Sequence, residues 1–365
     1  MGEATRGLST KKRQRGVTKL RDEQNVGSRH HVRANNCDKS SRPNAPRDAS
    51  SRKKTREHAL RAIAALINRC SKMAKTCFIL NPAAGSVKDV EALTAQLLSL
   101  PDSEVKLSAR HGSAERAARS AIRAGCALIV AAGGDGTLNE VINGVGEKSE
   151  GVQVALLPLG TGNDFARSVE LTTDVEECLE VIRAARTRPI DLVRVTSDQV
   201  RYFVNVSAGG FSGAVNEKLT PELKETWGPL AYVRGAAAAL SELRAFRANI
   251  SFDNTDALAL DLYNIVVANG RYVAGGMPIA PEASLDDGLL DVILLPATSA
   301  TQLTLLAPQI LLGKHLASDG VICRRAAKIC VNSKPGMWFN VDGELVGNEP
   351  ATFEVLPRAL QFVVP

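Results

Sequence analysis

The 365-residue sequence is poor in aromatic side chains and has no long apolar run. Phe, Trp and Tyr make up only 4% of the residues, so aliphatic side chains must fill the cores. No stretch approaches the ~20 consecutive apolar residues that a transmembrane helix needs, so we expect no membrane span. The basic N-terminus lacks an apolar segment, so we expect no secretory signal.

Cysteine and histidine are also scarce. The seven cysteines stand at positions 37, 70, 77, 126, 178, 323 and 330. They form no paired CxxC pattern, so neither a zinc site nor a disulfide framework is indicated, and we expect reduced thiols in a cytoplasmic protein. His111 and His315 are the only histidines after Met73, and as isolated residues both are interpreted as structural.

Charge is distributed unevenly along the chain. Residues 1–72 carry 19 basic and 6 acidic side chains, a net charge of +13, whereas the remainder has a net charge of −7. This basic extension has few hydrophobic residues up to about Thr55, so we expect it to be disordered, with a short helix over Glu57–Cys70. Three interpretations stay open. The extension binds anionic lipid or nucleic acid, it is solvated and has no role, or translation starts at Met73 and residues 1–72 are not part of the native protein.

From Met73 to about Asp191, apolar runs alternate with helical patterns. We expect strands at Thr76–Leu80, Glu104–Ser108, Ala127–Ala132 and Val152–Leu157. We expect helices at Val87–Leu100, Ser113–Ala124 and Leu138–Val145 and a further helix from Phe165. This alternation predicts an α/β domain over residues 73–193, in which helices wrap a parallel sheet.

After Asp191 the pattern becomes mostly β. We expect strands at Tyr202–Ser207, Asn249–Phe252, Leu258–Asn269, Leu289–Leu295 and Lys328–Val331, and helices at Pro229–Leu243 and Thr301–Leu312. These segments predict a second, sandwich-like β domain over residues 194–352. The last residues, about 353–365, contain short strands that could rejoin the first domain.

A glycine-rich turn, Gly133-Gly134-Asp135-Gly136, follows one of the apolar strands. Glycines between a strand and a helix leave backbone N–H groups free for an anion, and the helix N-terminus adds partial positive charge. No GxxxxGK[ST] or GxGxxG pattern is present at this turn, so it is neither a P-loop nor a dinucleotide fingerprint. Asp135 would repel a bare phosphate, so it either orders the loop or faces Mg²⁺ that bridges phosphates.

Three further glycine-containing stretches also lie at predicted strand ends: Asn81–Gly85, Pro158–Phe165 and Asn340–Glu344. Ligands of open α/β sheets bind outside the carboxyl ends of the strands, so loops there could converge on one site.

The segments NPAAG, GGDGTLNEVINGV, PLGTGNDFAR and VDGE, in this order, resemble the diacylglycerol kinase catalytic family, which also contains sphingosine and ceramide kinases and bacterial lipid kinases. The resemblance covers about Lys75–Pro365. It implies an α/β nucleotide-binding domain, a β-rich lipid-substrate domain and an active site in the cleft between them. It also implies transfer of the γ-phosphate of ATP to a lipid hydroxyl, with Mg²⁺ as cofactor and diacylglycerol as the favoured acceptor, which would yield phosphatidic acid.

Other activities stay open. The loop PLGTGNDFAR is closer to diacylglycerol kinases than to the GSGN-type loop of sphingosine kinases. A sphingosine- or ceramide-type kinase is therefore the first alternative. An NAD-kinase-like phosphotransferase and a non-catalytic nucleotide-binding regulator are the others.

The resemblance also implies roles for individual residues. Nucleotide contacts are implied for Asn81, Pro82, Gly85, Ser108, Gly133, Gly134, Asp135, Gly136, Thr137, Leu138, Asn139, Thr161, Asn163, Asp164 and Asp191. A structural Mg²⁺ site is implied at Asp287, assisted by the carbonyl groups of Ser284 and Leu289, although Asp-Asp-Gly is also a good turn sequence.

Proton abstraction from the lipid hydroxyl is implied for Asp342 and Glu344. On an extended segment both side chains would face the same side, whereas Gly343 between them permits a turn. The sequence does not decide which of the two is the base.

The expected partners are ATP and a lipid at the membrane surface, with no nucleic acid. The protein would then be cytoplasmic and peripherally associated with the membrane. Gly209–Tyr232 is a candidate lipid-facing region, with core packing as the alternative. Trp227 and Trp338 are interpreted as packing residues, and a homodimer is left open.

Overall fold

The structure is a computed structural model that describes residues 76–147, 151–210, 244–253, 255–342, 344–348 and 350–365. The basic extension 1–72 and the predicted helices Glu57–Cys70 and Pro229–Leu243 lie outside these residues, as does most of the predicted lipid-facing region. No helix within the described ranges is long and apolar enough to cross a membrane.

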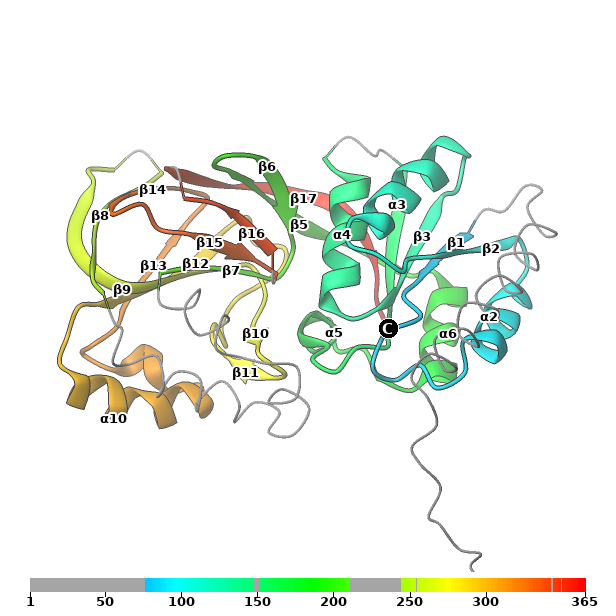
Figure 1. Ribbon diagram of the computed structural model, residues 1–365, viewed down its shortest axis with the longest axis horizontal. Coiled ribbons are helices and arrows are strands. Elements are labelled where there is room, and N and C mark those ends of the chain that lie inside the picture. Colours follow the sequence, from blue (N-terminus) through cyan, green and yellow to red (C-terminus); the bar gives the residue numbers. More distant parts are fainter. Residues whose placement is uncertain (1–75, 148–150, 211–243, 254, 343, 349) are drawn as a thin grey trace, which may run out of the picture. The chain divides into compact units, whose positions relative to one another are not determined.

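The first half of the described chain is an α/β unit. Its elements are β1 (Thr76–Leu80), α2 (Val90–Leu98), β2 (Ser103–Leu107), α3 (Ser113–Arg123), β3 (Leu128–Gly133), α4 (Asp135–Val145), β4 (Gln153–Pro158), α5 (Asp164–Ser168) and α6 (Val175–Ala184). The four strands are parallel in the order β2-β1-β3-β4. Helices α3 and α4 lie on one side of this sheet, and α2 and α6 lie on the other (Figure 1). The predicted parallel sheet wrapped by helices is therefore confirmed, and α6 is a helix that the sequence pattern did not predict.

Burial explains why the central strands form where they do. Every residue of β3 is buried, as expected for a strand that helices cover on both faces. Helices α2 and α6 begin at aspartates, Asp89 and Asp174, whose carboxylates accept N–H groups of the first helical turn. Helix α4 begins directly after the glycine turn, with Gly134 as its N-cap residue.

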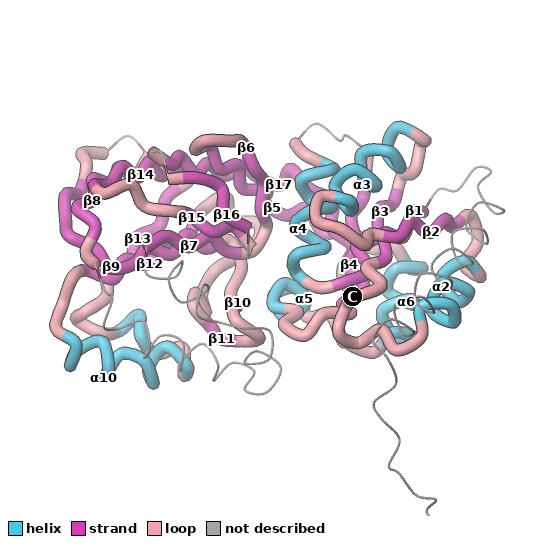
Figure 2. The backbone as a smooth tube through the Cα atoms, viewed as in Figure 1, coloured by secondary structure: helices cyan, strands magenta, loops and turns pink. Residues whose placement is uncertain are grey.

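The second half is mostly β structure (Figure 2). Its strands are β5 (Thr187–Thr196), β6 (Val200–Phe203), β7 (Val206–Gly210), β8 (Phe246–Phe252), β9 (Leu258–Ala268), β10 (Tyr272–Val273), β11 (Met277–Pro278), β12 (Leu290–Pro296), β13 (Ile322–Ala326), β14 (Lys328–Lys334), β15 (Phe339–Val341), β16 (Glu344–Gly347) and β17 (Ala351–Val363). The described helical elements are α10 (Ala300–Leu311) and a short 3-10 helix (His315–Ala317). The predicted strand Tyr202–Ser207 is in fact two strands, β6 and β7, and the sequence pattern missed β5, β10, β11, β13, β15 and β16.

The last strand, β17, belongs to both halves of the described chain. Its first residues pair with β14, its length pairs antiparallel with β5, and Gln361 and Phe362 pair parallel with β4. The register with β5 shifts between Leu356 and Leu360, where Arg358 has a φ of 53°. The C-terminal residues therefore do rejoin the α/β unit. The predicted domain boundaries at 193/194 and 352/353 fall inside β5 and β17 rather than in linkers.

Candidate active site

Three glycine-containing loops meet at the carboxyl ends of β1, β3 and β4. A Cβ atom on Gly160 would lie 2.5 Å from the Cα atom of Gly134, so the second and third loops touch through bare backbone. A Cβ atom on Gly85 would lie 2.8 Å from Oγ1 of Thr161, so the first loop packs against the third. The glycines are needed here because no side chain fits between the loops.

These loops form part of a cavity of about 440 Å³. Its lining residues are Asn81, Ala83, Ala84, Ser108, Ala109, Arg110, His111, Gly134, Gly136, Thr137, Glu140, Gly160 and Glu344. A second cavity of about 370 Å³, lined in part by Val331 and Met337, has no titratable side chain in its wall. The first cavity is therefore the candidate site.

Hydrogen bonds hold polar side chains of this cavity lining in place. Nδ2 of Asn81 lies 3.4 Å from Oγ1 of Thr137, which joins the first loop to the first turn of α4. The Oγ atoms of Ser108 and Ser113 lie 2.9 Å apart. Backbone N–H groups in the first turn of a helix lack intrahelical partners, so the start of α4 offers donors to an anion.

Asp135 orders the neighbouring loop. Its carboxylate accepts the N–H groups of Asp164 and Phe165, at 3.1 and 3.0 Å, at the start of α5. Asn163 closes the same loop by bonding both the N–H and the C=O of Gly160. The first of the two explanations for an acid inside the glycine turn, ordering of a loop, therefore has direct support.

Two other predicted nucleotide residues have structural partners. The Asp164 carboxylate accepts the N–H groups of Gly275 and Gly276, between β10 and β11, and burial raises its pKa. Asp191 is fully buried and accepts the N–H groups of Gly288 and Arg358, and burial raises its pKa too. Neither residue lines the cavity.

Several further predicted residues do not line the cavity either: Pro82, Gly85, Gly133, Leu138, Thr161 and Asn163. The Leu138 side chain is only 2% exposed and belongs to the hydrophobic core. A Cβ atom on Gly133 would lie 2.3 Å from Oγ1 of Thr137, so this glycine allows close packing of β3 against α4. These residues shape the loops, and their side chains have no place in the cavity wall.

Asp342 lies at a hairpin turn between β15 and β16, where Val341 pairs with Glu344. It has a φ of 44°, which suits an Asp-Gly hairpin turn. Its Oδ1 accepts the N–H of Val206 at 2.9 Å, and its Oδ2 accepts Nδ2 of Asn139 at 3.3 Å. Burial is the main reason that its pKa is raised to about 7, and these hydrogen bonds oppose the rise.

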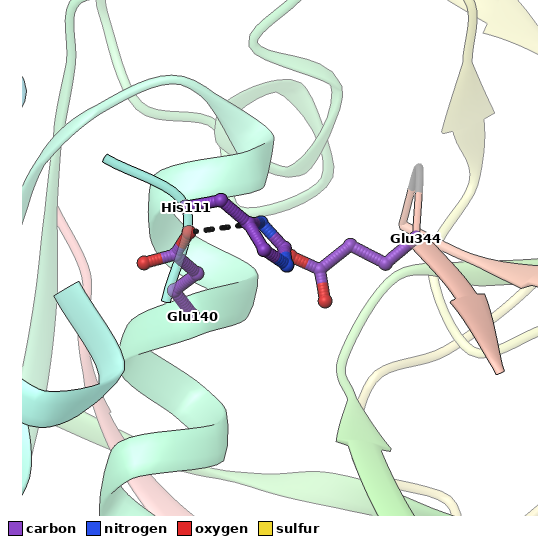
Figure 3. Close-up of side chains that lie close together, drawn as sticks. All are labelled: His111, Glu140 and Glu344. Carbon is purple, nitrogen blue, oxygen red and sulfur yellow. Dashed lines mark ion pairs between the residues drawn. The ribbon is translucent and has the colours of Figure 1, made fainter. Parts of the chain in front are cut away.

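Glu344 points to different partners because the chain turns between the two acids. Its Oε2 accepts NH2 of Arg201 at 2.9 Å, and its Oε1 lies 3.5 Å from Nδ1 of His111. Figure 3 shows the His111 ring between the carboxylates of Glu140 and Glu344. The prediction that His111 is isolated is therefore wrong, whereas His315 is buried and bonds to the carbonyl of Ile279, as a structural histidine would.

Asp287, the predicted Mg²⁺ ligand, already has partners for both carboxylate oxygens. Its Oδ1 accepts the N–H of Leu289 at 3.0 Å, and its Oδ2 pairs with Arg325. The Ser284 hydroxyl donates to Asp286 rather than to Asp287. A cation at this turn would have to displace the Arg325 guanidinium, so the donor set fits Mg²⁺ only after that side chain moves.

Sequence reasoning missed four residues around the site. Glu140 accepts the N–H groups of Gly112 and Ala114, both at 2.8 Å, and so caps α3 from α4. Asn143 bonds both the N–H and the C=O of Tyr202 and thereby docks α4 onto β6. Both residues lie within the motif GGDGTLNEVINGV, so the motif could have identified them as candidate site residues. Arg201 and His111 carry no local signal.

Comparison with known proteins follows the same division of the chain. Residues 75–195 match the family model described as diacylglycerol kinase catalytic domain, and residues 205–364 match the YegS C-terminal NAD kinase beta sandwich-like domain. A diacylglycerol kinase of Staphylococcus haemolyticus (strain JCSC1435) is 32% identical over 295 residues, which cover 79% of this chain and 87% of that protein. A diacylglycerol kinase of Staphylococcus aureus (strain bovine RF122 / ET3-1) is 31% identical and covers 79% and 91%.

Solved structures share the fold. The crystal structure of a diacylglycerol kinase from Bacillus anthracis str. Sterne has a TM-score of 0.60 at 20% identity, covering 81% of this chain and 98% of that one. A second crystal structure from the same organism has a TM-score of 0.67 at 23% identity, covering 81% and 96%.

Proposed function

The chain belongs to the diacylglycerol kinase catalytic family, and from this premise we propose that it is an ATP-dependent lipid kinase whose acceptor is diacylglycerol. Phosphoryl transfer to an alcohol needs a held phosphate, neutralised charge and a carboxylate that accepts the alcohol proton. The observation that carries the proposal is the cavity whose lining includes both the glycine loops at the start of α4 and Glu344 of the β15–β16 hairpin.

The nucleotide enters as its Mg²⁺ complex, which is the substrate. The phosphates bind against the N–H groups of Gly134, Gly136 and Thr137 at the start of α4, where the helix dipole favours negative charge. The accompanying Mg²⁺ neutralises phosphate charge. The Asp135 carboxylate is directed toward the N–H groups of α5 and does not line the cavity, so the backbone of the loop is left to face the phosphates.

Asp342 does not itself line the cavity, but it stands two residues before Glu344, which does, and burial raises its pKa to about 7; we therefore propose it as the base. A carboxylate poised near the working pH accepts a proton more effectively than an ordinary one. The N–H of Val206 and the amide of Asn139 hold its oxygens in place. Glu344 already has Arg201 as an ionic partner, so we assign it the role of orienting the reacting groups.

The acceptor is proposed to stay in the membrane while its hydroxyl enters the cavity. Extracting a diacyl lipid would cost about 0.8 kcal/mol per CH₂ group, so catalysis at the membrane surface avoids a large penalty. Trp338, directly before β15, is 49% exposed, and Leu345, next to Glu344 in β16, is 56% exposed. Exposure of Trp338 does not fit its interpretation as a packing residue, and it is a candidate membrane contact together with Leu345.

The Mg²⁺ site at Ser284, Asp287 and Leu289 stays a proposal with one condition. The carboxylate and carbonyl oxygens suit Mg²⁺, but the ion would have to compete with the Arg325 guanidinium for Oδ2 of Asp287.

The proposal is tested by incubating the purified full chain with γ-labelled ATP, Mg²⁺ and mixed micelles of one lipid at a time. We expect labelled phosphatidic acid from diacylglycerol and much less label from ceramide or sphingosine. Label transferred only to NAD would overturn the proposal in favour of an NAD-kinase-like enzyme. ATP binding without transfer to any acceptor would overturn it in favour of a regulator.

A matched variant makes the test specific to the proposed base. Asp253 resembles Asp342 in lying at a turn with a positive φ, 50°, and in accepting two N–H groups, here both from the backbone, but it is exposed and does not line the cavity. Asp342→Asn should abolish most transfer, whereas Asp253→Asn should retain it.

A further inference from the structure

Five charged or titratable side chains form a ring that starts and ends at the first turn of α3. This charge ring consists of Glu115, Arg201, Glu344, His111 and Glu140. Arg201 joins Glu115 to Glu344, His111 lies between Glu344 and Glu140, and Glu140 returns to the start of α3. Glu344 is the member that the β15–β16 hairpin contributes.

Arg201 makes the two shortest contacts between side chains of the ring. Its NH1 donates to Oε2 of Glu115 and its NH2 donates to Oε2 of Glu344, both at 2.9 Å. The side chain of each of these three residues is less than 20% exposed. Because the guanidinium is planar, holding one arm on Glu115 fixes the direction of the other arm.

Glu115, which holds one arm of the Arg201 guanidinium, is itself held in place. Glu115 lies in the first turn of α3, and its other oxygen pairs with Arg119 one turn further along. Glu140 secures the start of the same helix by accepting the N–H groups of Gly112 and Ala114. Both oxygens of Glu140 are used in this way, so the ring is a holding arrangement rather than a vacant cation site.

Glu344 is one of three ring members, with His111 and Glu140, that line the candidate active-site cavity. It follows the Asp342 turn directly and lines the candidate active-site cavity. An unrestrained glutamate would sample several rotamers at such a position. Arg201 donates to its carboxylate, and Figure 3 shows the His111 ring beside the same carboxylate, so both restrict Glu344 at the cavity wall.

We propose that Arg201 is a positioning residue for the kinase reaction, which acts by holding Glu344 at the wall of the active-site cavity. The inference rests on the proposed function, since Glu344 acts on the reacting groups only if the chain is a kinase. Arg201 does not line the cavity but donates directly to Glu344, which does, so its effect on the reaction passes through Glu344.

The chain offers a close control in Arg194. Its guanidinium also joins two glutamates, with NH1 3.0 Å from Glu147 and NH2 2.6 Å from Glu354. None of these three residues lines the cavity. Arg194→Gln therefore removes the same kind of double ion pair as Arg201→Gln, but outside the cavity lining. We expect it to change the stability of the fold and not the rate of the reaction.

The experiment measures kcat and KM for Mg·ATP in the diacylglycerol assay for the wild type, Arg201→Gln, Arg201→Lys and Arg194→Gln. We expect Arg201→Gln to lower kcat about 10- to 100-fold, as misplacement of an orienting group does, with little change in KM for ATP. Arg201→Lys should recover part of the loss, because lysine keeps the charge but lacks the fork. Arg194→Gln should keep kcat.

A double variant separates positioning from general damage. If Arg201 acts through Glu344, Arg201→Gln combined with Glu344→Gln should be no slower than Glu344→Gln alone. Additive losses, or equal kcat values for Arg201→Gln and Arg194→Gln, would overturn the inference while leaving the proposed function intact. A wild-type chain that phosphorylates no lipid would overturn the proposed function, and the inference with it.

Discussion

Replacing Asp342 by asparagine should change how the stability of the fold depends on pH. Asparagine keeps the size of the side chain and one acceptor oxygen for the N–H of Val206, but it cannot ionise. In the ligand-free wild type, burial raises the pKa of Asp342 from 3.8 to about 7. Between these values the folded chain holds a proton that the unfolded chain releases.

The sign of the effect follows from that proton. Stability that the bound proton contributes is complete below about pH 4 and is lost as the pH rises to about 7, because the unfolded chain then binds fewer protons than the folded one. At about 1.4 kcal/mol per pKa unit, the whole loss is on the order of 4 kcal/mol. The side chain keeps some exposed surface, so this is an upper value.

The assay is denaturant unfolding of the ligand-free wild type and Asp342→Asn from pH 5 to pH 8. We expect the variant to gain stability relative to the wild type as the pH rises to 7, and to gain nothing further above it. Asp253→Asn, the exposed turn variant, should follow the wild type at every pH. A constant difference between the wild type and Asp342→Asn would refute the assignment of a raised pKa to Asp342.

The same variant tests the catalytic role. Removing a general base costs roughly 10²- to 10⁴-fold in rate, so kcat of Asp342→Asn should fall by that factor with Mg·ATP affinity nearly unchanged. In the wild type, kcat/KM should fall as the pH drops below about 7, because protonated Asp342 cannot accept the lipid proton. A rate that is flat from pH 5 to pH 8 would remove Asp342 as the base.

Three other changes have defined outcomes. Glu344→Gln should lower kcat about 10- to 100-fold while circular dichroism reports an unchanged fold, and a normal rate would exclude Glu344 from the reaction. Gly160→Ala should lower the free energy of unfolding by about 1–3 kcal/mol and weaken ATP binding in calorimetry, because the new Cβ atom would lie 2.5 Å from the backbone of the second loop. In the control Gly320→Ala the new Cβ atom has no neighbour closer than 3.9 Å, so stability and ATP binding should stay unchanged. Mg²⁺ should raise the melting temperature of Arg325→Gln more than that of the wild type, since Arg325 competes for Asp287, and equal shifts would rule out that competition.

The sequence predicted those parts of the fold that depend on local pattern. The apolar runs at β1, β3 and β4 indicated strands buried on both faces, and the glycines after them indicated loops that could converge. The β15–β16 hairpin was missed because its strands have only three and four residues, too few for a period to be recognised. The turn between them was still one of the two geometries that Gly343 left open.

Site residues that depend on distant partners were harder to predict. Arg201 and Glu344 are 143 residues apart, so no spacing rule joins them. The choice between two roles for Asp135 required knowing that the start of α5 lies beside it. Asp164 and Asp191 carry the residue type that the motif requires, yet their partners are N–H groups of loops in the β-rich half and of β17.

Strand β17 ties the order of synthesis to the order of folding. Parallel strand β4 gains its outer neighbour only from Gln361 and Phe362, which follow β4 in the chain after the whole β-rich half. A nascent chain that has already emerged as far as α6 therefore leaves β4 with an unpaired edge, and such edges invite pairing with other chains. The nucleotide-binding half therefore completes its sheet only after the β-rich half has been synthesised.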